Sequence, residues 1–414
     1  MKKKVTMIIP SYWRREQALG IKDSDTIYDH PTPLDSEGTL RRAIESTKIL
    51  HNKEFELVIV GVANASDIED RVENKILNIL SKTEVDVPLY FFSYSHLKKL
   101  YSLLENITSN RSLYLLSLKG YPKIRNICIF IAHILNSDVA ILIDDDEVFE
   151  DPFFIEKATE FIGEKIDLGF VGAIAGYYLQ ADGTWKLKSK HEEWTKYWNT
   201  VEKMNEAFEI FIGRGPRLKE TPFVFGGNMI IHRSVFTNIP FDPGINRGED
   251  IDYLINMRIF KYKCYIDNIL SIKHLPPPKP YPIWKQMRED IFRFIFEREK
   301  LRSQKKIDNL HYVTPEELDP YPGAFLRDDL EEKIYRASHA LSEYYKSKGM
   351  DEDAIEALKN IEFSYKDRLI KNDPFVHLLD VKNDWENLIK YTNNLDLKKQ
   401  LSLCIKQVKN EFSS

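Results

Sequence analysis

The sequence predicts an α/β fold with a mixed, mainly parallel sheet, followed by a helical C-terminal region. Short runs of apolar and β-branched residues alternate with stretches of helical spacing up to about residue 275. These runs are apolar at successive positions, which is typical of strands buried on both faces of a parallel sheet. After residue 275 the chain changes to prolines and then to amphipathic, highly charged stretches.

Four strands are expected in the first 150 residues, at 4–12, 55–66, 87–95 and 138–143. The first, KVTMIIPSY, is expected to end in a turn at Pro10 and Ser11. The second and third, FELVIVGVANAS and VPLYFFSYS, are rich in Val, Ile and Phe, which favour strands. The fourth, DVAILI, runs directly into four consecutive acids.

Helices are expected between these strands, because apolar residues recur there at intervals of three and four. GTLRRAIESTKIL (38–50) places Leu40, Ile44 and Lys48 on one face, and IEDRVENKILNILSK (68–82) has the same kind of pattern. RNICIFIAHILNS (125–137) reads as a helix that delivers the chain to the fourth strand. Strands separated by helices favour parallel pairing.

The C-terminal third begins with five prolines, which cannot continue a helix or occupy a central strand, at positions 276, 277, 278, 280 and 282. We expect an extended connector there. Beyond it, 283–304 and 327–349 have the apolar spacing of amphipathic helices, and Gly349 is expected to end the second. We expect the helices of this region to pack against the rest of the chain and to form a homo-oligomer.

The composition excludes several classes of protein. The 414 residues are 43% hydrophobic and carry a net charge of −5, with 59 basic residues spread among 64 acidic ones. This balance argues against bulk electrostatic binding of nucleic acid, so no nucleic acid partner is expected. No stretch has the roughly 18 apolar residues of a membrane span. Three cysteines without CxxC spacing predict free thiols in a reducing cytoplasm.

The stretch ILIDDDEVFEDP (141–152) ends an apolar strand in a block of acids. Asp144 and Asp146 lie two apart, with Asp145 and Glu147 beside them, and on a turn their carboxylates can converge on one cation. Mg²⁺ and Mn²⁺ prefer oxygen ligands and are often bound by one or two carboxylates plus substrate phosphates. A solvated acidic turn is the alternative. His274, which follows an apolar strand, is either structural or a further metal ligand.

Two further stretches combine residue types that suit a binding site. VFGGNMIIHRSVF (224–236) places two glycines and an asparagine before a strand, where the backbone can approach a ligand closely or simply form a turn. GINRGEDIDYLINMR (244–258) places Glu249 and Asp250 at the start of a helical stretch. An acid there either caps the helix or, in a pocket, acts as a general base.

In this order the stretches resemble the glycosyltransferases of the GT-A fold, especially family 2 and its relatives. The resemblance covers residues 4 to about 275 and rests on IIPSYWR, KIRNICIFIAH, IDDDEVFEDPFF, FGGNMIIHRSVF and RGEDIDYLINMR. It implies a Rossmann-like glycosyltransferase domain at 1–275, with a donor half at about 1–150 and an acceptor half at about 151–275. The proline-rich connector and helical region occupy 276–414.

The resemblance also implies a role for individual residues. A nucleotide-diphospho-sugar donor is expected at Pro10, Ser11, Tyr12, Asn64, Lys123, Arg125, Asp144 and Asp145. The acceptor is expected at Gly226, Gly227 and Asn228. Mg²⁺ or Mn²⁺ is expected at Asp144, Asp146 and His274. The catalytic residues are expected to be Asp250, the base of inverting members, and Glu249 beside it.

The expected function is metal-dependent transfer of a sugar to a hydroxyl of a small soluble or oligosaccharide acceptor, with inversion. Some relatives that use a DxD pattern and a distal His retain the anomeric configuration, so a retaining enzyme with His274 as metal ligand is the first alternative. A nucleotidyltransferase is the second, although IIPSYWRRE poorly matches its Gly-rich, basic signature. The sequence departs from the family in VGVANAS, which has no acid at the end of the second strand. It also lacks the QxxRW motif.

Overall fold

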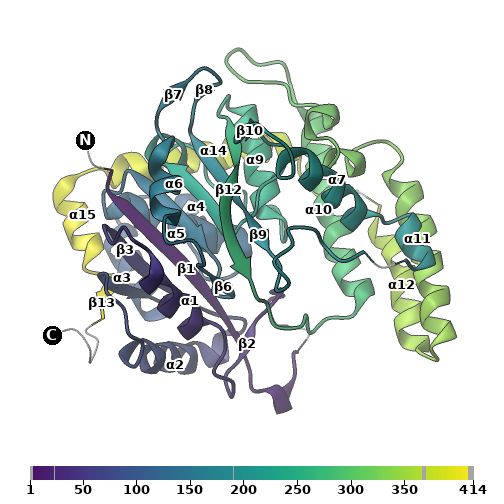
Figure 1. Cartoon of the computed structure of the whole chain (residues 1–414), viewed down its shortest axis with the longest axis horizontal. Helices are drawn as coiled ribbons and strands as arrows, with labels where there is room; N and C mark the ends of the chain where they lie inside the picture. The colour runs from purple at the N-terminus through teal and green to yellow at the C-terminus, as the bar shows by residue number, and fades with distance from the viewer. Residues whose placement is uncertain (1–2, 23, 190, 366–369, 409–414) are drawn as a thin grey trace.

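The computed structural model describes residues 3–22, 24–189, 191–365 and 370–408, and this part of the chain is built around one large sheet (Figure 1). Its strands follow the order β10 (Leu218–Glu220), β12 (Cys264–His274), β9 (Ala173–Leu179), β11 (Asn228–His232), β5 (Val139–Ile143), β1 (Val5–Arg14), β3 (Phe55–Ala63), β4 (Leu89–Phe92) and β13 (Lys406–Gln407). Two short strands join its sides, β2 (Thr32–Pro33) on β1 and β6 (Glu147–Val148) on β12. Strands β7 (Lys165–Ile166) and β8 (Gly169–Phe170) form a separate pair.

The sheet is mixed and mainly parallel, so the predicted α/β class is confirmed. Strands β5, β1, β3 and β4 are parallel neighbours, and β9 pairs with β12 in parallel. Strand β11 lies antiparallel between β5 and β9, so its first residue, Asn228, pairs with the last residue of β5, Ile143. The loops at the carboxyl ends of β1 and β5 therefore meet residues that lead into β11, which is where the site forms.

Strand β1 is longer than the sequence predicted. The expected turn at Pro10 and Ser11 is wrong, because the strand continues to Arg14 and pairs with β3 as far as Trp13. Its pairing with β5 ends at Ile8 and its pairing with β2 begins only at Trp13, so at Pro10 one side of the strand carries no ladder. A residue without an N–H is tolerated where pairing has ended on one side.

Helices cover both faces of the sheet, as continuous apolar strands require. On β1, Met7 and Ile9 point into one core cluster and Ile8 into the other, because side chains alternate along a strand. The first cluster is covered by α1 (Leu40–Ser46), α2 (Glu69–Ser81) and α6 (Phe154–Glu160). The second is covered by α3 (Tyr94–Leu104), α4 (Asn110–Tyr114), α5 (Tyr121–Ile134), α7 (Thr200–Phe211), α8 (Arg233–Phe236) and α9 (Glu249–Ile259).

The helices expected from the sequence are present, with small shifts at their ends. Helix α1 stops at Ser46 and continues as a short 3-10 turn to Ile49. Helix α5 begins four residues before the expected start, with Pro122 in its first turn, where its missing N–H has no intrahelical role. None of the described helices is long and apolar enough to cross a membrane.

The C-terminal region is helical, as predicted, and it packs onto the same core. It comprises α10 (Ile283–Ser303), α11 (Leu330–Ser347), α12 (Asp351–Phe363), α14 (Pro374–Tyr391) and α15 (Leu395–Ser402). Figure 1 shows α11 and α12 at one side of the molecule and α15 at the other, next to β13. The Trp385 indole is fully buried and donates to the carbonyl of Phe236 at 3.0 Å. Oligomerisation through these helices stays a prediction.

A buried ionic cluster joins α10 and α14 to the residues around α9. The Lys300 ammonium lies 2.9 Å from Asp242 and 2.5 Å from Asp252, and all three side chains are fully buried. It also donates to Asn256 at 3.0 Å. On the other side of Asp242, His377 lies 3.2 Å away. Because a buried charge is costly unless it is paired, this cluster fixes how the C-terminal helices sit against α9.

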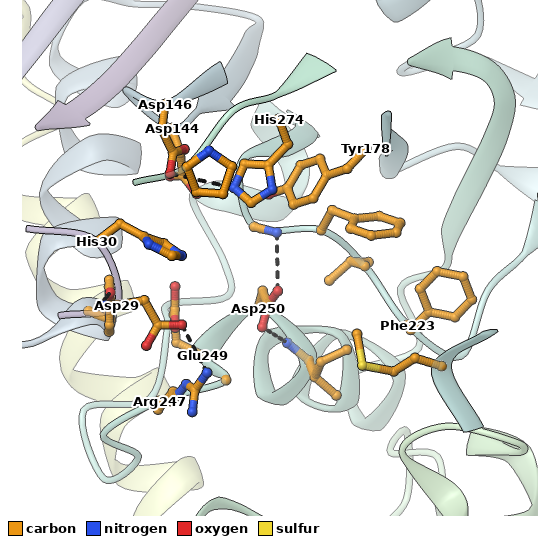
Figure 2. A pocket seen from close by; sticks show the side chains of 18 of the residues that line it. Asp29, His30, Asp144, Asp146, Tyr178, Phe223, Arg247, Glu249, Asp250 and His274 are labelled. Carbon is orange, nitrogen blue, oxygen red and sulfur yellow. Dashed lines mark hydrogen bonds and ion pairs between the residues drawn. The ribbon is translucent and has the colours of Figure 1, made fainter. Parts of the chain in front are cut away.

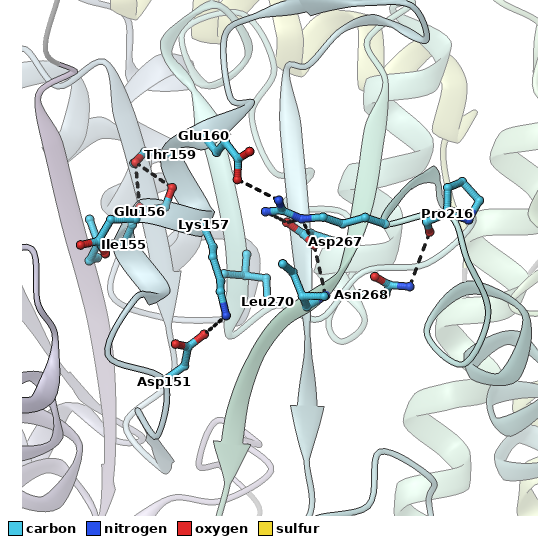
Figure 3. A network of polar contacts seen from close by, with 12 residues as sticks. Asp151, Ile155, Glu156, Lys157, Thr159, Glu160, Pro216, Asp267, Asn268 and Leu270 are labelled. Atoms are coloured by element: carbon cyan, nitrogen blue, oxygen red, sulfur yellow. Dashed lines mark hydrogen bonds and ion pairs between the residues drawn. The ribbon is translucent and has the colours of Figure 1, made fainter.

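A second ionic cluster holds an irregular part of β12, whose pairing with β9 shifts register between Ile266 and Ser271 (Figure 3). The Asp267 carboxylate is fully buried within this irregularity and accepts from Nε of Arg217 at 3.0 Å and from its Nη2 at 2.8 Å. Arg217 also donates to Glu160 on α6 at 2.8 Å. The cluster therefore anchors β12 upstream of its last residue, His274.

We expect Arg217→Met to lower the free energy of unfolding by about 2–4 kcal/mol, because it leaves the Asp267 carboxylate buried without its cation. Urea unfolding of the full chain measures this. Arg41→Met is the matched control, since Arg41 pairs with Glu45 on an exposed helix face and such pairs contribute little. Equal stability of the two variants would show that Arg217 does not anchor β12.

We expect the stability of the chain to fall as pH rises from about 6 to about 9, through His377. The hydrogen bond with Asp242 raises the pKa of His377 above its ordinary value. The folded state therefore binds this proton more tightly than the unfolded state. The stabilisation is complete below the unfolded pKa of about 6.5 and is lost as pH rises through the higher folded pKa. Urea unfolding at several pH values should give a smaller slope for His377→Gln than for the parent chain; equal slopes would contradict the prediction.

Candidate functional site

A cavity of about 450 Å³ lies at the carboxyl ends of β1 and β5 (Figure 2). Its lining comes from the turn after β5, the start of α5, the start of α9, the end of β12 and the C-terminal region. This is the edge at which α/β sheets bind ligands, and the volume lies within the range of roughly 300–1,000 Å³ that is usual for small-molecule sites.

The pairing of two strands brings the acid block to His274. Strand β6 begins at Glu147, the last of the four acids, and pairs antiparallel with the end of β12, so that Glu147 lies opposite His274. The Leu275 amide donates to the carbonyl of Asp146 at 2.9 Å. Nε2 of His274 then lies 3.5 Å from Oδ2 of Asp146. The imidazole also stacks on Tyr178, with ring centroids 4.7 Å apart.

Arg125 joins the acid block to the start of α9. It projects from α5 and its side chain is 3% exposed. Nη2 donates to Asp144 at 2.8 Å, and Nε donates to Glu249 at 3.3 Å. The sequence predicted that Arg125 and Asp144 would both meet the donor. The structure adds that they meet each other, so Asp144 has an ionic partner within the chain itself.

The four acids are electrostatically unequal. Burial would raise the pKa of Asp146, but the hydrogen bond and charge of His274 outweigh it and hold the pKa below its ordinary value. Burial, reinforced by the charge of Asp146, raises the pKa of Asp145 and Asp144, although Arg125 opposes the effect at Asp144. Burial and the charge of Asp144 raise the pKa of Glu147. The surroundings of Asp144, Asp145 and Glu147 therefore disfavour their charged forms, and an added cation would favour those forms.

The residues at this end of the cavity fit a divalent cation with incomplete protein ligation. Asp146 supplies a carboxylate, and His274 supplies an imidazole nitrogen, and an oxygen-to-nitrogen separation of 3.5 Å suits adjacent ligands of one ion. In the described part of the chain, no group of three or more His, Cys, Asp and Glu residues is gathered closely enough to hold a metal ion. Two protein ligands leave positions for substrate phosphates and water, as is usual for Mg²⁺. Asp144 as a third ligand stays a prediction.

The three residues that were expected to contact the acceptor have different surroundings. Gly226 lines the cavity. Gly227 lies behind it, and a Cβ there would come within 2.1 Å of Glu147 and 2.7 Å of Asp144, so a glycine is needed for the acids to approach. Asn228 is fully buried and its amide donates to the carbonyl of Leu270 at 3.2 Å, away from the cavity lining. The geometry of the cavity does not support contact between Asn228 and the acceptor, and that contact stays a prediction.

Asp250 lies near the middle of the cavity (Figure 2). Gly248, with a φ of +73°, precedes α9, so Glu249 and Asp250 occupy its first turn. One Asp250 oxygen accepts from the Gly226 amide at 3.1 Å, and the other accepts from its own neighbour Ile251 at 2.8 Å. These bonds fix the carboxylate. Each oxygen has two lone pairs, so both keep capacity to accept a proton.

Glu249 is the second acid of this pair. It is 7% exposed, and burial, reinforced by the charge of Asp250, raises its pKa. Arg125 donates to it, so one of its oxygens is already engaged. Glu249 and Asp250 both line the cavity, as predicted.

The sequence missed several charged residues of the cavity because they come from distant segments. Asp29 and His30 belong to the long loop after β1, and Asp29 lies 2.9 Å from both Arg247 and Lys279. Arg293 on α10 packs so closely on Gly248 that a Cβ there would lie 2.2 Å from its Cδ. The length of the loop after β1 was the only signal for the first two. No local pattern marked Arg247, Lys279 or Arg293.

The C-terminal region therefore contributes to the cavity, which the sequence did not predict. It supplies Lys279, Arg293 and Tyr321 to the lining. We expected this region to serve packing and assembly alone. The buried face of α10 includes Arg293 and Glu297 as well as apolar residues. Arg293 lies against Gly248, directly before the start of α9.

Several residues predicted to bind the donor lie outside the cavity. Tyr12, Arg125, Asp144 and Asp145 line it. Ser11 instead donates to Asp145 at 2.5 Å, and Pro10 is buried in β1. The Lys123 ammonium lies 3.7 Å from the ring centre of Tyr114 on the outer side of α5. The Asn64 amide is buried, and neither its oxygen nor its nitrogen has a hydrogen-bond partner. Donor contact by these four residues is not supported by the cavity as it stands.

No protein-family model matches the sequence, and no curated protein is significantly similar to it. Solved structures with a similar fold include the mannosyltransferase PcManGT from Pyrobaculum calidifontis, solved with GDP-Man and Mn²⁺. It is 12% identical, with 97% of this chain and 88% of that chain covered and a TM-score of 0.44.

Two further solved structures are similar at the same low level. Glucosyl-3-phosphoglycerate synthase from Mycobacterium tuberculosis, solved with Mn²⁺ and UDP-glucose, is 12% identical, with 71% of this chain and 77% of that chain covered and a TM-score of 0.33. GalNAc-T7, solved with UDP, GalNAc and Mn²⁺, is 11% identical, with 86% of this chain and 59% of that chain covered and a TM-score of 0.33. Likenesses this distant carry no weight for substrate or metal, so the function proposed below rests on the site of this chain.

Proposed function

We propose that this chain is a metal-dependent glycosyltransferase, which moves a sugar from a nucleotide-diphospho-sugar to an acceptor hydroxyl with inversion. The observation that carries the proposal is the position of Asp250 in a cavity whose polar end holds Asp146 and His274. A cation site and a separate fixed carboxylate are the two elements that such a transfer needs. The resemblance to GT-A glycosyltransferases is in accord with this assignment.

The donor diphosphate is assigned to the end of the cavity that holds the acids. Asp146 and His274 would hold the divalent ion, Mg²⁺ or Mn²⁺, and such an ion would neutralise charge on the departing diphosphate. Arg125 keeps Asp144 in place and adds a guanidinium at the cavity wall. Because Arg125 is buried, its charge acts in a medium of lower dielectric than water and has a larger effect on a nearby phosphate.

Asp250 is assigned as the general base. Its oxygens are held by two backbone amides, so the carboxylate cannot turn away from the cavity. It takes the proton of the acceptor hydroxyl as that oxygen attacks the anomeric carbon from the face opposite the diphosphate. The bond from sugar to diphosphate breaks as the bond to the acceptor forms, and the configuration inverts. In the retaining alternative, Asp146 and His274 are the same two metal ligands, but Asp250 does not act as the general base.

The first test concerns the metal. We expect UDP or GDP to bind the parent chain more tightly with Mn²⁺ than with EDTA, and Asp146→Ala to remove most of that difference. Isothermal titration of both nucleotides measures the affinities. Asp151→Ala is the control, because Asp151 lies five residues further on, outside the cavity lining, and pairs with Lys157 at 2.5 Å. Equal affinity with and without metal in the parent chain would refute the proposed cation site.

The second test concerns the base. We expect Asp250→Asn to lower transfer by about a hundredfold or more, the usual size of a general-base contribution, while nucleotide affinity stays nearly unchanged. If Asp250 only stabilises the start of α9, Asn should replace it well. Glu249→Gln is the matched comparison and should have the smaller effect on transfer. The anomeric coupling constant of the product, measured by NMR, must report inversion; retention, or near-normal transfer by Asp250→Asn, would overturn the assignment.

A further inference from the structure

The cavity has a second end that differs chemically from the first. Six apolar residues, here called the apolar wall, line it: Leu187, Met204, Phe208, Phe223, Val224 and Phe225. Phe208 packs against Phe223 and Phe225, with ring centroids 5.2 Å apart in each case, which gives the wall a rigid backing. Leu187 and Met204 are only half-buried and so keep free apolar surface.

The apolar wall lies on the opposite side of Asp250 from the acid block. Figure 2 shows Asp250 between Asp146 and His274 on one side and Phe223 on the other. The wall continues directly into Gly226, whose amide holds the Asp250 carboxylate. A molecule resting on the wall would therefore present its nearest group to Asp250.

Part of the backbone of the wall is already hydrogen-bonded within the chain. The Phe223 carbonyl accepts from the Thr221 hydroxyl at 2.7 Å, and the Phe223 amide donates back to that hydroxyl at 3.3 Å. The Phe225 carbonyl accepts from the backbone amide of Asn228 at 3.0 Å. None of the six side chains carries a hydrogen-bonding group. Sugar hydroxyls enclosed here would lose water without gaining a partner, which is costly.

We infer that the acceptor carries its reactive hydroxyl next to an apolar body, alkyl or aromatic, which rests on the apolar wall. The inference depends on the proposed function, because the wall is assigned to the acceptor only if Asp250 is the base that the acceptor hydroxyl approaches. An apolar body gains free energy by covering Leu187 and Met204, and burial of a group the size of a phenyl ring favours binding by about ten- to a hundredfold. The cavity volume of about 450 Å³ limits the enclosed part to a small group.

The test compares glucosides that differ only in the aglycone: methyl, n-butyl and phenyl β-glucoside. Each is titrated calorimetrically into the full chain without nucleotide, so the result does not depend on donor binding. We expect phenyl or n-butyl glucoside to bind at least tenfold more tightly than methyl glucoside. The n-butyl and phenyl arms separate an alkyl from an aromatic body. Equal affinities for all three would overturn the inference.

Variants on one helix show whether the preference arises at the wall. Met204→Gln places an amide of similar size on the cavity side of α7 and should reduce the preference for the apolar aglycone to about threefold or less. Ile210→Gln makes the same kind of change on the outer side of α7, where Ile210 is 39% exposed and is not part of the lining of this cavity, and should leave the preference intact. Equal effects of the two variants would also overturn the inference.

The same titrations keep the two proposals apart. UDP and GDP, each with Mn²⁺, are titrated in separate runs and report on the glycosyltransferase assignment alone. A wall-dependent preference for apolar glucosides without nucleotide binding would support an apolar-ligand site and remove the proposed function. Nucleotide binding without any aglycone preference would keep the proposed function and remove the inference.

Discussion

The antiparallel pairing of β6 with the end of β12 is the contact on which the site depends. It joins the turn after β5 to a strand more than a hundred residues later and sets His274 opposite Glu147. Without it, the four neighbouring acids would lose His274 as a partner. The register of β12 shifts between Ile266 and Ser271, upstream of His274, and the buried Asp267 pairs with Arg217 within that irregular part. The fold thus positions His274 through an ionic contact far from the cavity.

The sequence predicted those parts of the fold and site that local pattern determines. The apolar strands before and after residue 100, the acid block, and the acids Glu249 and Asp250 at a helix start all depend on residues close together in the chain. Asn228 lies outside the cavity lining, which its position in the sequence could not show, because spacing does not distinguish a side chain that faces a cavity from one that faces a sheet carbonyl. Arg247, Lys279 and Arg293 reach the cavity only through tertiary packing, which leaves no periodic trace in the sequence.

The C-terminal helices also relate differently to the site than their amphipathic pattern suggests. An apolar stripe predicts a buried face, and α10 has one, but its buried residues also include Arg293, Glu297 and Lys300. These charges are tolerated because each has a partner on the same helix or beside α9. Burying a charged side chain costs desolvation free energy, which is offset only when its partner lies in a specific geometry. Apolar contacts depend less on geometry, so the ionic contacts place the tighter limit on the orientation of the helix. The cost is consistent with a need to hold the first turn of α9 in one position.

In its proposed role as general base, Asp250 would face opposite demands from the two ends of the cavity. A general base works best when its carboxylate is charged, which favours water or cations nearby, yet water near the attacked carbon would compete with the acceptor hydroxyl. In this chain the charge is accommodated by two backbone amides, which stabilise a carboxylate without bringing a mobile cation or water to it. The apolar wall then leaves little reason for water to remain on the acceptor side. The same glycine-containing segment supplies both features, since Gly226 donates to Asp250 and Phe223 to Phe225 form part of the wall.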